Sequence, residues 1–208
     1  MSPHPGWPVE LRAGPVLLRP PRRRDAAAWS AARNLNREWL QPWEPTSASS
    51  WTARSSKASW TNLATTLRAN ARAGTGIPLV IVYGERLVGQ VNASNIFRGV
   101  LRSASVGYWI DSAVAGRGIM PASVGLMIDH LLGPVGLHRV EINIRPENTN
   151  SLRVVEKLGL RQEGLHERFL DIDGAWRDHL TFAITVEETA GGSVLSRLGH
   201  LPKPPAAP

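Results

Sequence analysis

The sequence predicts an α/β domain in which a mixed sheet carries helices on both faces. Helix and strand patterns alternate along the chain in the order β-α-α-β-β-β-α-β-α-β-β, which is typical of helices packed on a sheet. Near the end of the chain, Asp173-Gly174 indicates a β-hairpin, because this pair is favoured in two-residue turns. The most regular helix spans about 120–132, and its apolar positions form one stripe: Val124, Met127, Ile128, Leu131 and Leu132.

Composition narrows the class of protein. The 208 residues are 42% hydrophobic, which is enough for a folded core. They include no cysteine, which excludes a disulfide framework, a thiolate zinc site and a cysteine nucleophile, and we expect no metal. The net charge is +7, and residues 1–24 hold five arginines against one glutamate. This basic segment either meets nucleic acid or an acidic surface, or is a solvated loop.

The elements follow from local patterns. A strand at 16–19 precedes a helix that Asp25 caps and that runs to about 34. A tryptophan- and proline-rich loop at 39–45 leads to a polar helix at about 53–72. Strands at 77–83 and 87–96 form a hairpin, and a further strand at 105–110 leads to the apolar helix. A strand at 140–144, a helix at 150–158 and a hairpin of strands 169–172 and 175–186 complete the domain.

These boundaries give a short arm at 1–8, one folded domain at 9–186 and a proline-rich tail at 187–208. We expect the tail to be disordered apart from a short helix at about 194–198. The N-terminus has no apolar signal core, and the longest apolar runs are far shorter than a membrane span. We therefore expect a cytoplasmic protein that contacts no membrane.

A glycine turn at 115–121 joins the 105–110 strand to the apolar helix. Gly116 and Gly118 allow a tight turn and the close approach of an anion, and Pro121 suits the first turn of a helix. The unpaired N–H groups and the helix dipole there can bind phosphate, and Arg117 adds positive charge. A plain strand-to-helix turn is the alternative.

Two features near the glycine turn, one in the preceding strand and one downstream, bear on what the turn could bind. Gly107 indicates a bulge or a close backbone approach, and a bulge would splay this strand from the next parallel one. The slot so opened could take an extended amide chain. Downstream, Asn148 and Asn150 lie between the next strand and helix, where either could also serve only as a helix cap.

This combination resembles the GNAT superfamily of acetyl-CoA-dependent N-acetyltransferases over about residues 9–186. The pyrophosphate-loop motif of the superfamily matches residues 115–120, its Asn-x-x-Ser/Ala element matches 148–151, and its Leu-Gly-Phe/Leu matches 158–160. Segments 40–45 and 173–179 look like the RimJ/RimL type, which acetylates the N-terminal amine of ribosomal proteins. Ala115 replaces the Arg or Gln of the motif and Met120 its second Gly or Ala, which predicts weaker acetyl-CoA binding than is typical.

The resemblance implies a GNAT fold, with a mostly antiparallel sheet of six to seven strands whose central parallel strands splay apart. It also implies a binding site for acetyl-CoA. The backbone of Tyr108, Trp109 and Ile110 would meet the pantetheine and the acetyl carbonyl, and Asn148 would lie beside the pantetheine. The pyrophosphate would lie on Gly116, Arg117, Gly118, Ile119, Met120 and Pro121.

The catalytic residues are less defined. The alternating strand 139–145 places Glu141 and Asn143 on its non-core face, towards the slot. Some relatives carry a glutamate base where Asn143 stands and a tyrosine acid where Val155 stands. We therefore predict Glu141, acting through a water, or Glu44 as the base, although a salt bridge with Arg139 would also explain Glu141.

The remaining candidates line the path of the acceptor or assist the leaving group. Ser151 is predicted to support the departing thiolate. Trp39, Trp43, Glu44 and Asn143 are predicted to bind the acceptor, although tryptophans of this kind also serve in ordinary packing. Asp178 and His179 are expected to make hairpin and sheet contacts rather than to catalyse.

The absence of a strong direct base favours an acceptor that is already partly neutral. An α-amine is roughly 14% neutral at pH 7 and a lysine side chain roughly 0.04%. We thus predict an Nα-acetyltransferase acting on the N-terminus of a ribosomal or other protein, as a monomer or homodimer, with weak ribosome or RNA association. The alternatives are an acetyltransferase for a small amine and a non-catalytic module bound to ribosome or RNA.

Overall fold

The computed structural model describes residues 6–205, so most of the predicted arm at 1–8 lies outside the described residues. The strands are β1 Leu11–Ala13, β2 Val16–Arg19, β3 Ile77–Tyr83, β4 Arg86–Phe97, β5 Ser103–Ile110, β6 Arg139–Ile144, β7 Arg161–Ile172 and β8 Ala175–Thr185. The α-helices are α1 Ala26–Leu35, α2 Arg37–Leu40, α3 Trp51–Arg54, α4 Lys57–Ala73, α5 Ile119–Leu132 and α6 Thr149–Lys157. Short 3₁₀ helices η1 to η5 lie at Arg23–Asp25, Gln41–Trp43, Ser112–Val114, Val186–Thr189 and Leu195–Leu198.

Within residues 6–205, one sheet contains eight strands in the order β1-β2-β3-β4-β5-β6-β8-β7. Every neighbouring pair is antiparallel except β5 and β6, which are parallel. The mixed, mostly antiparallel α/β architecture predicted from sequence is confirmed. The predicted number of six to seven strands is too low because β1, three residues joined to β2 by a tight turn, is too short to show an alternating pattern.

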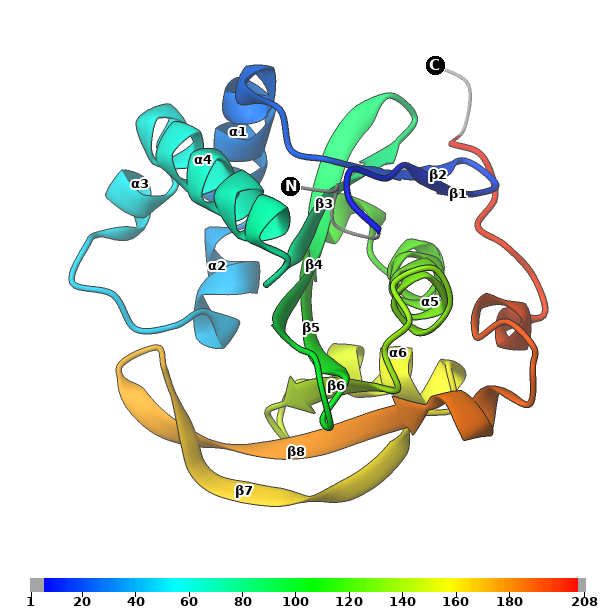
Figure 1. Cartoon of the computed structure of the whole chain (residues 1–208). Coiled ribbons are helices and arrows are strands. Elements are labelled where there is room, and N and C mark those ends of the chain that lie inside the picture. Colours follow the sequence, from blue (N-terminus) through cyan, green and yellow to red (C-terminus); the bar gives the residue numbers. More distant parts are fainter. Residues whose placement is uncertain (1–5, 206–208) are drawn as a thin grey trace.

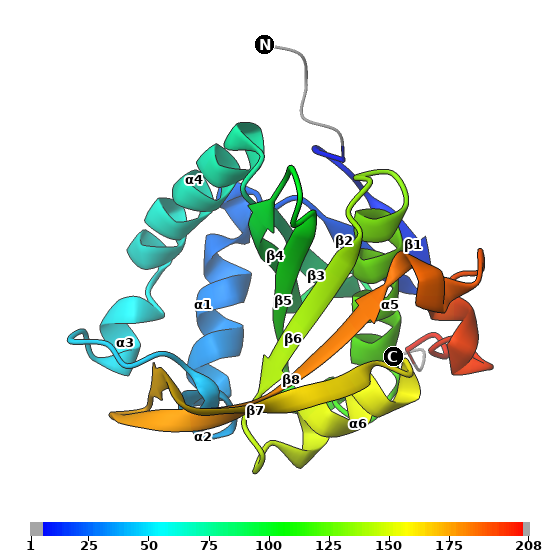
Figure 2. The ribbon, with the colours of Figure 1, turned by 60° about the horizontal axis from the view of Figure 1, so that its bottom comes forward.

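Helices cover both faces of the sheet, as predicted (Figure 1). On one face α5 and α6 pack on the main apolar core, which includes the fully buried Met127, Ile128 and Leu131. On the other face α1 and α4 enclose a smaller cluster around Trp29 and Trp60, whose ring centroids are 5.1 Å apart. This second face is also the side on which α2 and α3 lie (Figure 2).

Several predicted boundaries are wrong, each for a local reason. The helix expected at 53–72 is two helices, because Ser56 caps α4 by accepting a hydrogen bond from Ser59 N at 3.1 Å. The loop at 39–45 is partly helical, containing the end of α2 and η2. The strand expected at 169–172 begins at Arg161, because β7 is an exposed edge strand and lacks an apolar pattern.

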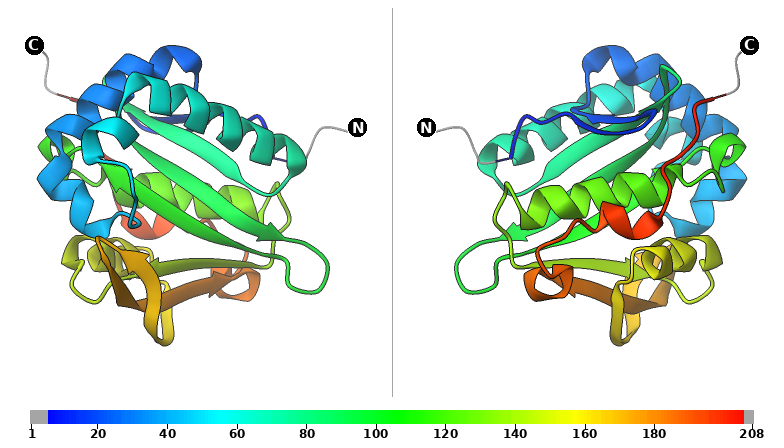
Figure 3. Two further views of the ribbon diagram at one scale, coloured as in Figure 1. Left: turned by 90° about the vertical axis from the view of Figure 1, so that its left-hand side faces the viewer. Right: turned by 90° about the vertical axis from the view of Figure 1, so that its right-hand side faces the viewer.

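The segment after β8 packs on the domain, contrary to the disorder expected for 187–208. Val194 is fully buried, and Asp129 of α5 accepts hydrogen bonds from Ser193 Oγ at 2.6 Å, Val194 N at 2.6 Å and Leu195 N at 3.1 Å. Figure 3 shows the segment lying along α5. The predicted helix at 194–198 is confirmed as η5, and residues 206–208 lie outside the described residues.

The chain then continues past the start of α5 to the β3–β4 turn. A methyl group on Gly118 would lie 3.9 Å from Pro202 Cγ, and Tyr83 donates its hydroxyl hydrogen to Lys203 O at 2.8 Å. The C-terminal segment therefore spans the length of α5 and passes beside the glycine turn. Between residues 6 and 205 no helix is long and apolar enough to cross a membrane.

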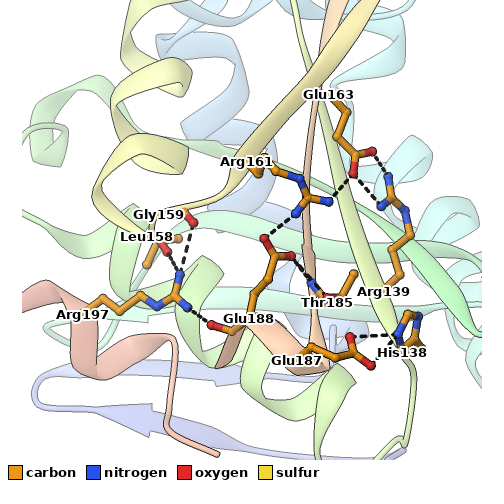
Figure 4. Close-up of polar contacts among 10 residues, drawn as sticks. All are labelled: His138, Arg139, Leu158, Gly159, Arg161, Glu163, Thr185, Glu187, Glu188 and Arg197. Atoms are coloured by element: carbon orange, nitrogen blue, oxygen red, sulfur yellow. Dashed lines mark hydrogen bonds and ion pairs between the residues drawn. The ribbon is translucent and has the colours of Figure 1, made fainter. Parts of the chain in front are cut away.

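An ion network joins the β6 and β7 strands to the segment after β8 (Figure 4). Arg139 of β6 binds Glu163 of β7, with Arg139 Nη1 donating to Glu163 Oε1 at 2.9 Å. Arg161 donates to Glu163 Oε1 at 2.5 Å and also pairs with Glu188. Arg197 donates to the carbonyl oxygens of Leu158 and Glu188 at 2.8 and 2.7 Å, so the network also ties down the C-terminal segment.

Candidate active site

The two parallel strands separate midway along their length. Pairing between β5 and β6 runs from Ser103 opposite Arg139 to Ser105 opposite Glu141 and then stops. Past that point the strands diverge (Figure 3, left) and flank a cavity of about 190 Å³. A methyl group on Gly107 would meet no atom within 4 Å, so the position opens directly into this gap.

The splay is thus present, but the bulge predicted at Gly107 is not its cause. Gly107 pairs with Asn92 in regular register, and the register break between β4 and β5 lies between Ser94 and Phe97. The strands separate without an irregularity at the glycine itself. The missing side chain instead keeps the space beside β5 clear.

A larger cleft of about 620 Å³ adjoins this gap and shares with it Trp43, Gly107, Tyr108, Asn148 and Ser151. The predicted coenzyme residues that line it are Tyr108, Trp109, Ile110, Gly116, Gly118, Ile119, Met120, Pro121, Asn148 and Ser151. Arg117 is the exception: it is exposed and does not line the cleft. Residues from three separated segments therefore meet at one site, as the motifs predicted.

The glycine turn has the backbone shape that an anion site needs. Gly116 and Gly118 have φ values of 77° and 78°, a region in which any residue with a side chain would be strained. Helix α5 begins at Ile119, and its first N–H groups have no partner within the helix. The side chains of Ile119 and Met120 are buried in the main core. The bulk of Met120 thus points inward and leaves the backbone of the turn accessible.

Two hydroxyl groups face each other at the centre of the site. Tyr108 Oη lies 2.7 Å from Ser151 Oγ. Burial raises the pKa of the Tyr108 hydroxyl well above its usual value, and the hydrogen bond with Ser151 opposes this only in part. Tyr108 therefore keeps its proton and holds the Ser151 hydroxyl in place. Asn148 caps α6 by accepting from Ser151 N at 3.1 Å, so its predicted capping role is realised.

The residues predicted to bind the acceptor, Trp39, Trp43 and Glu44, also line the large cleft. Trp39 Nε1 donates to Ile110 O at 3.0 Å, which joins α2 to the end of β5. The guanidinium of Arg145 lies 5.2 Å from the ring centroid of Trp43. Glu44 is not a free carboxylate, because Arg33 Nη1 lies 2.8 Å and Arg54 Nη1 3.9 Å from its oxygens. These two cations reduce the attraction that Glu44 can exert on a protonated amine.

Arg33 is held in an unusual setting for a cation. Its side chain is buried, and its guanidinium lies within 6 Å of the ring centroids of Trp29, Trp51 and Trp109. Some of the tryptophans therefore pack in the core, and others line the cleft.

The structure separates the two predicted residues of β6. Asn143 lines the smaller cavity and accepts a hydrogen bond from Thr181 Oγ1 at 2.6 Å. Glu141 lies on the same strand face but lines neither cavity, and its Oε1 accepts from Arg139 Nε at 2.7 Å. Its contacts match the salt bridge considered as the alternative. The structure does not bring Glu141 to the cleft as a base.

Other residues of the site were not predicted from sequence. Arg153 and Lys157 of α6 line the large cleft, one turn apart on the face that also carries Asn150. That helical spacing would have identified them. Asn92 also lines the cleft, and its buried Oδ1 has no hydrogen-bond partner among residues 6–205. His179, expected to make only sheet contacts, lines the smaller cavity.

No group of three or more His, Asp or Glu side chains within the described part of the chain could hold a metal ion. The two cavities are lined by backbone groups, hydroxyls, amides, aromatic rings and cations, together with the Glu44 carboxylate and the His179 imidazole. Such a set can bind a phosphate-bearing chain at α5 and α6 and a second reactant on the opposite face.

Comparisons with known proteins agree with this geometry. The structure is similar to that of Mycobacterium smegmatis RimJ in complex with CoA-disulfide, with a TM-score of 0.90 and 47% identity over 94% of this chain and 96% of that one. The Escherichia coli [ribosomal protein uS5]-alanine N-acetyltransferase is 27% identical over 186 residues, which cover 88% of this chain and 94% of that protein. A probable N-acetyltransferase of Bacillus subtilis, YjcK, is 41% identical over 100 residues, and this match spans only 55% of the relative. Residues 16–161 match the family described as acetyltransferase (GNAT) domain, and the chain belongs to this family of acetyltransferases.

Proposed function

We propose that this acetyltransferase transfers the acetyl group of acetyl-CoA to the N-terminal α-amine of a protein. One observation carries the proposal: a continuous site runs from the N-terminus of α5, past the opening between β5 and β6, to the tryptophan side of the sheet. Two reactants can therefore reach the same point from opposite faces. The similarity to RimJ and to a ribosomal-protein alanine acetyltransferase supports a protein N-terminus as the acceptor.

The residues present suit acetyl-CoA. The open turn at Gly116 and Gly118 offers backbone N–H groups to a diphosphate at the positive end of α5. Arg153 and Lys157 place two further cations on the wall of the cleft for the remaining phosphate charge. The gap between β5 and β6 exposes strand backbone that can bind the amide groups of the pantetheine arm.

The reaction is direct acyl transfer between two bound reactants. The neutral amine attacks the thioester carbonyl carbon, the C–N bond forms, the C–S bond breaks and the thiolate leaves, and the nitrogen gives up one proton so that a neutral amide results. Holding both reactants in line supplies much of the acceleration. Ser151, held by the hydroxyl of Tyr108, would donate a hydrogen bond to the leaving sulfur.

A thiol-release assay over a peptide panel tests this proposal. The peptides differ in their first residue, and each has a counterpart with a blocked N-terminus. We expect release of coenzyme A only with free N-termini, and a product mass increased by one acetyl group on the α-amine. Acetylation of lysine side chains in blocked peptides, or of small amines alone, would contradict it.

A further inference from the structure

His179 is a buried titratable group in the wall of the reaction cavity, and the mechanism above does not use it. Its side chain is 4% exposed, and the cavity between β5 and β6 that it lines has a volume of only about 190 Å³. Gly107, Tyr108 and Ser151 line the same small space. The imidazole therefore lies across a short gap from the hydroxyl pair at the centre of the site.

The sheet register shows from which side His179 approaches. Thr181, two residues along β8, bonds Asn143 of β6, and His179 shares this strand face. Because Ser105 is opposite Glu141, Asn143 and Gly107 are on the same face of the sheet. This is the face covered by α1 and α4, whereas Ser151 reaches the cavity from α6 on the other face (Figure 1). His179 is thus on the acceptor side, together with Trp43.

The hydrogen bond of the ring fixes which nitrogen can accept a proton. His179 Nδ1 lies 3.0 Å from Arg177 O. A carbonyl oxygen can only accept, so Nδ1 carries the hydrogen and Nε2 holds the free lone pair. No hydrogen bond to Nε2 is formed within residues 6–205, although the ring lines an open cavity.

The surroundings keep this imidazole neutral. Burial lowers the pKa of His179, and the positive charge of Arg145 lowers it further. The bond to Arg177 O and the negative charges of Glu147 and Asp178 oppose these effects without reversing them.

Two more titratable groups, His166 and Tyr108, lie near the ring on neighbouring elements. His166 of β7 pairs across the hairpin with His179, and Phe169 makes edge contacts with both rings at centroid distances of 4.8 and 5.8 Å. From β5, the Tyr108 hydroxyl shares the cavity and stays protonated. Neither group supplies a negative charge that would stabilise the protonated form of His179.

We propose that Nε2 of His179 is the general base that takes the proton of the acceptor amine. As the amine nitrogen bonds to the carbonyl carbon and the C–S bond breaks, the proton moves to Nε2. The thiolate takes up a proton from solvent, and the imidazolium returns its own to water. This inference rests on the proposed acyl transfer, and it supplies the base that Glu141 cannot provide from its place beside Arg139.

A pair of substitutions on the same hairpin tests it. His179→Gln keeps an amide N–H for Arg177 O but removes the basic nitrogen, whereas His166→Gln changes the exposed histidine opposite. We expect His179→Gln to lower kcat about 100-fold, the range typical of a lost general base, with both KM values within about threefold of wild type. His166→Gln should leave kcat near the wild-type value.

Two further measurements separate catalysis from a structural role. Added imidazole should restore part of the kcat of His179→Ala, because the truncated side chain leaves room for it in the cavity. The wild-type kcat should fall in acid as pH drops through the lowered pKa of His179, and this loss should be absent in His179→Gln. The matched pair, His179→Gln and His166→Gln, should retain the wild-type melting temperature within about 3 °C.

The outcomes are distinct. If wild type acetylates peptide N-termini and His179→Gln keeps its kcat, His179 is not the base while the proposed function stands. If wild type acetylates only other amines, the proposed function fails, and the same comparison with those amines still decides the role of His179. If no amine is acetylated, both proposals are wrong. An equal loss of kcat in both histidine variants, or no rescue by imidazole, would indicate a structural role.

Discussion

The Tyr108–Ser151 contact joins a strand residue to a helix residue at the cavity between β5 and β6. The hydroxyl group of Ser151 could rotate freely on its own, and the tyrosine hydroxyl at 2.7 Å selects one orientation. Because burial raises the pKa of Tyr108, this contact persists through the neutral and mildly alkaline range. The tyrosine thus acts as a positioning residue for the serine.

Replacement of Tyr108 by phenylalanine should therefore lower kcat about five- to tenfold, because a single neutral hydrogen bond is lost. The KM for acetyl-CoA should change little. In a Ser151→Ala background the same change should have almost no further effect on kcat, and a double-mutant cycle measures this. Tyr83→Phe, which removes a hydroxyl bonded to Lys203 O away from the cleft, is the matched control for kcat. Additive losses would refute the coupling.

The cations of α6 lead to a second expectation. Reversal of both charges, Arg153→Glu with Lys157→Glu, should raise the KM for acetyl-CoA at least about tenfold, and less so at high salt. Arg117→Glu should have a smaller effect, since Arg117 is exposed and outside the cleft lining. Steady-state kinetics at two ionic strengths measure both. Arg72→Glu, on an exposed part of α4, is the control, and equal KM values for all variants would exclude a role for α6.

For single residues, the sequence predicted the strand face that a side chain occupies better than it predicted the partners of that side chain. Alternation placed Glu141 and Asn143 correctly on one face of β6. It left open whether Glu141 would act as a base or pair with Arg139, two residues away on the same face, because that choice depends on side-chain reach rather than on period. His179 was missed for a similar reason: its cavity exists only where β5 and β6 diverge.

Among the elements, the segment after β8 differs most from its prediction. Its proline-rich composition predicts disorder, and the prolines do prevent regular structure. Three hydrogen bonds to Asp129 and the burial of Val194 nevertheless fix it on α5. These contacts are distant in sequence, so no local pattern contains them. Helices α5 and α6 were predicted well because their stripes and caps are local.

Asp129→Ala should therefore destabilise the fold by about 1–3 kcal/mol, because two backbone N–H groups lose their partner. Urea denaturation measures the change. Ser196→Ala removes one hydrogen bond within the same segment, from Ser196 Oγ to Ser193 O at 2.6 Å, and should cost less than half as much. Equal free energies of unfolding for wild type and Asp129→Ala would show that the segment is not anchored by this carboxylate.

For the whole molecule, the ion network beside β7 determines part of the stability in acid. Hydrogen bonds from Arg139 lower the pKa of Glu163 to about 2, well below the value of an unfolded chain. A carboxyl with a lowered pKa stabilises the fold at pH values above its unfolded pKa. That contribution is lost as pH falls from about 4.5 towards 2.

Glu163→Gln should accordingly cost about 1 kcal/mol at pH 7, a modest value because solvent screens this partly exposed pair. The difference between variant and wild type should shrink towards zero at pH 2. Thermal unfolding at pH 7, 4 and 2 measures the trend. Glu167→Gln, at an exposed position nearby, is the control, and a difference independent of pH would contradict the assignment.

The positive charge of the N-terminal region is also partly compensated within the fold. Arg19 binds the buried Asp25 at 2.7 Å, and Arg22 lies 3.2 Å from Glu10. Asp25 lies one residue beyond the arginine-rich segment 1–24, so it adds a negative charge that the segment by itself lacks. The basic patch is thus smaller in the folded chain than in the sequence, which weakens the case for nucleic acid as its partner.

The C-terminal segment is anchored on α5 at Val194, and its Pro202 passes beside Gly118. Residues 194–203 and the glycine turn, which are distant in sequence, are therefore neighbours in the fold. A ligand that orders the glycine turn should also steady the chain beside it, since a methyl group on Gly118 would already lie 3.9 Å from Pro202 Cγ. Saturation with coenzyme A should therefore slow amide hydrogen exchange between residues 194 and 203, far along the chain from the turn itself.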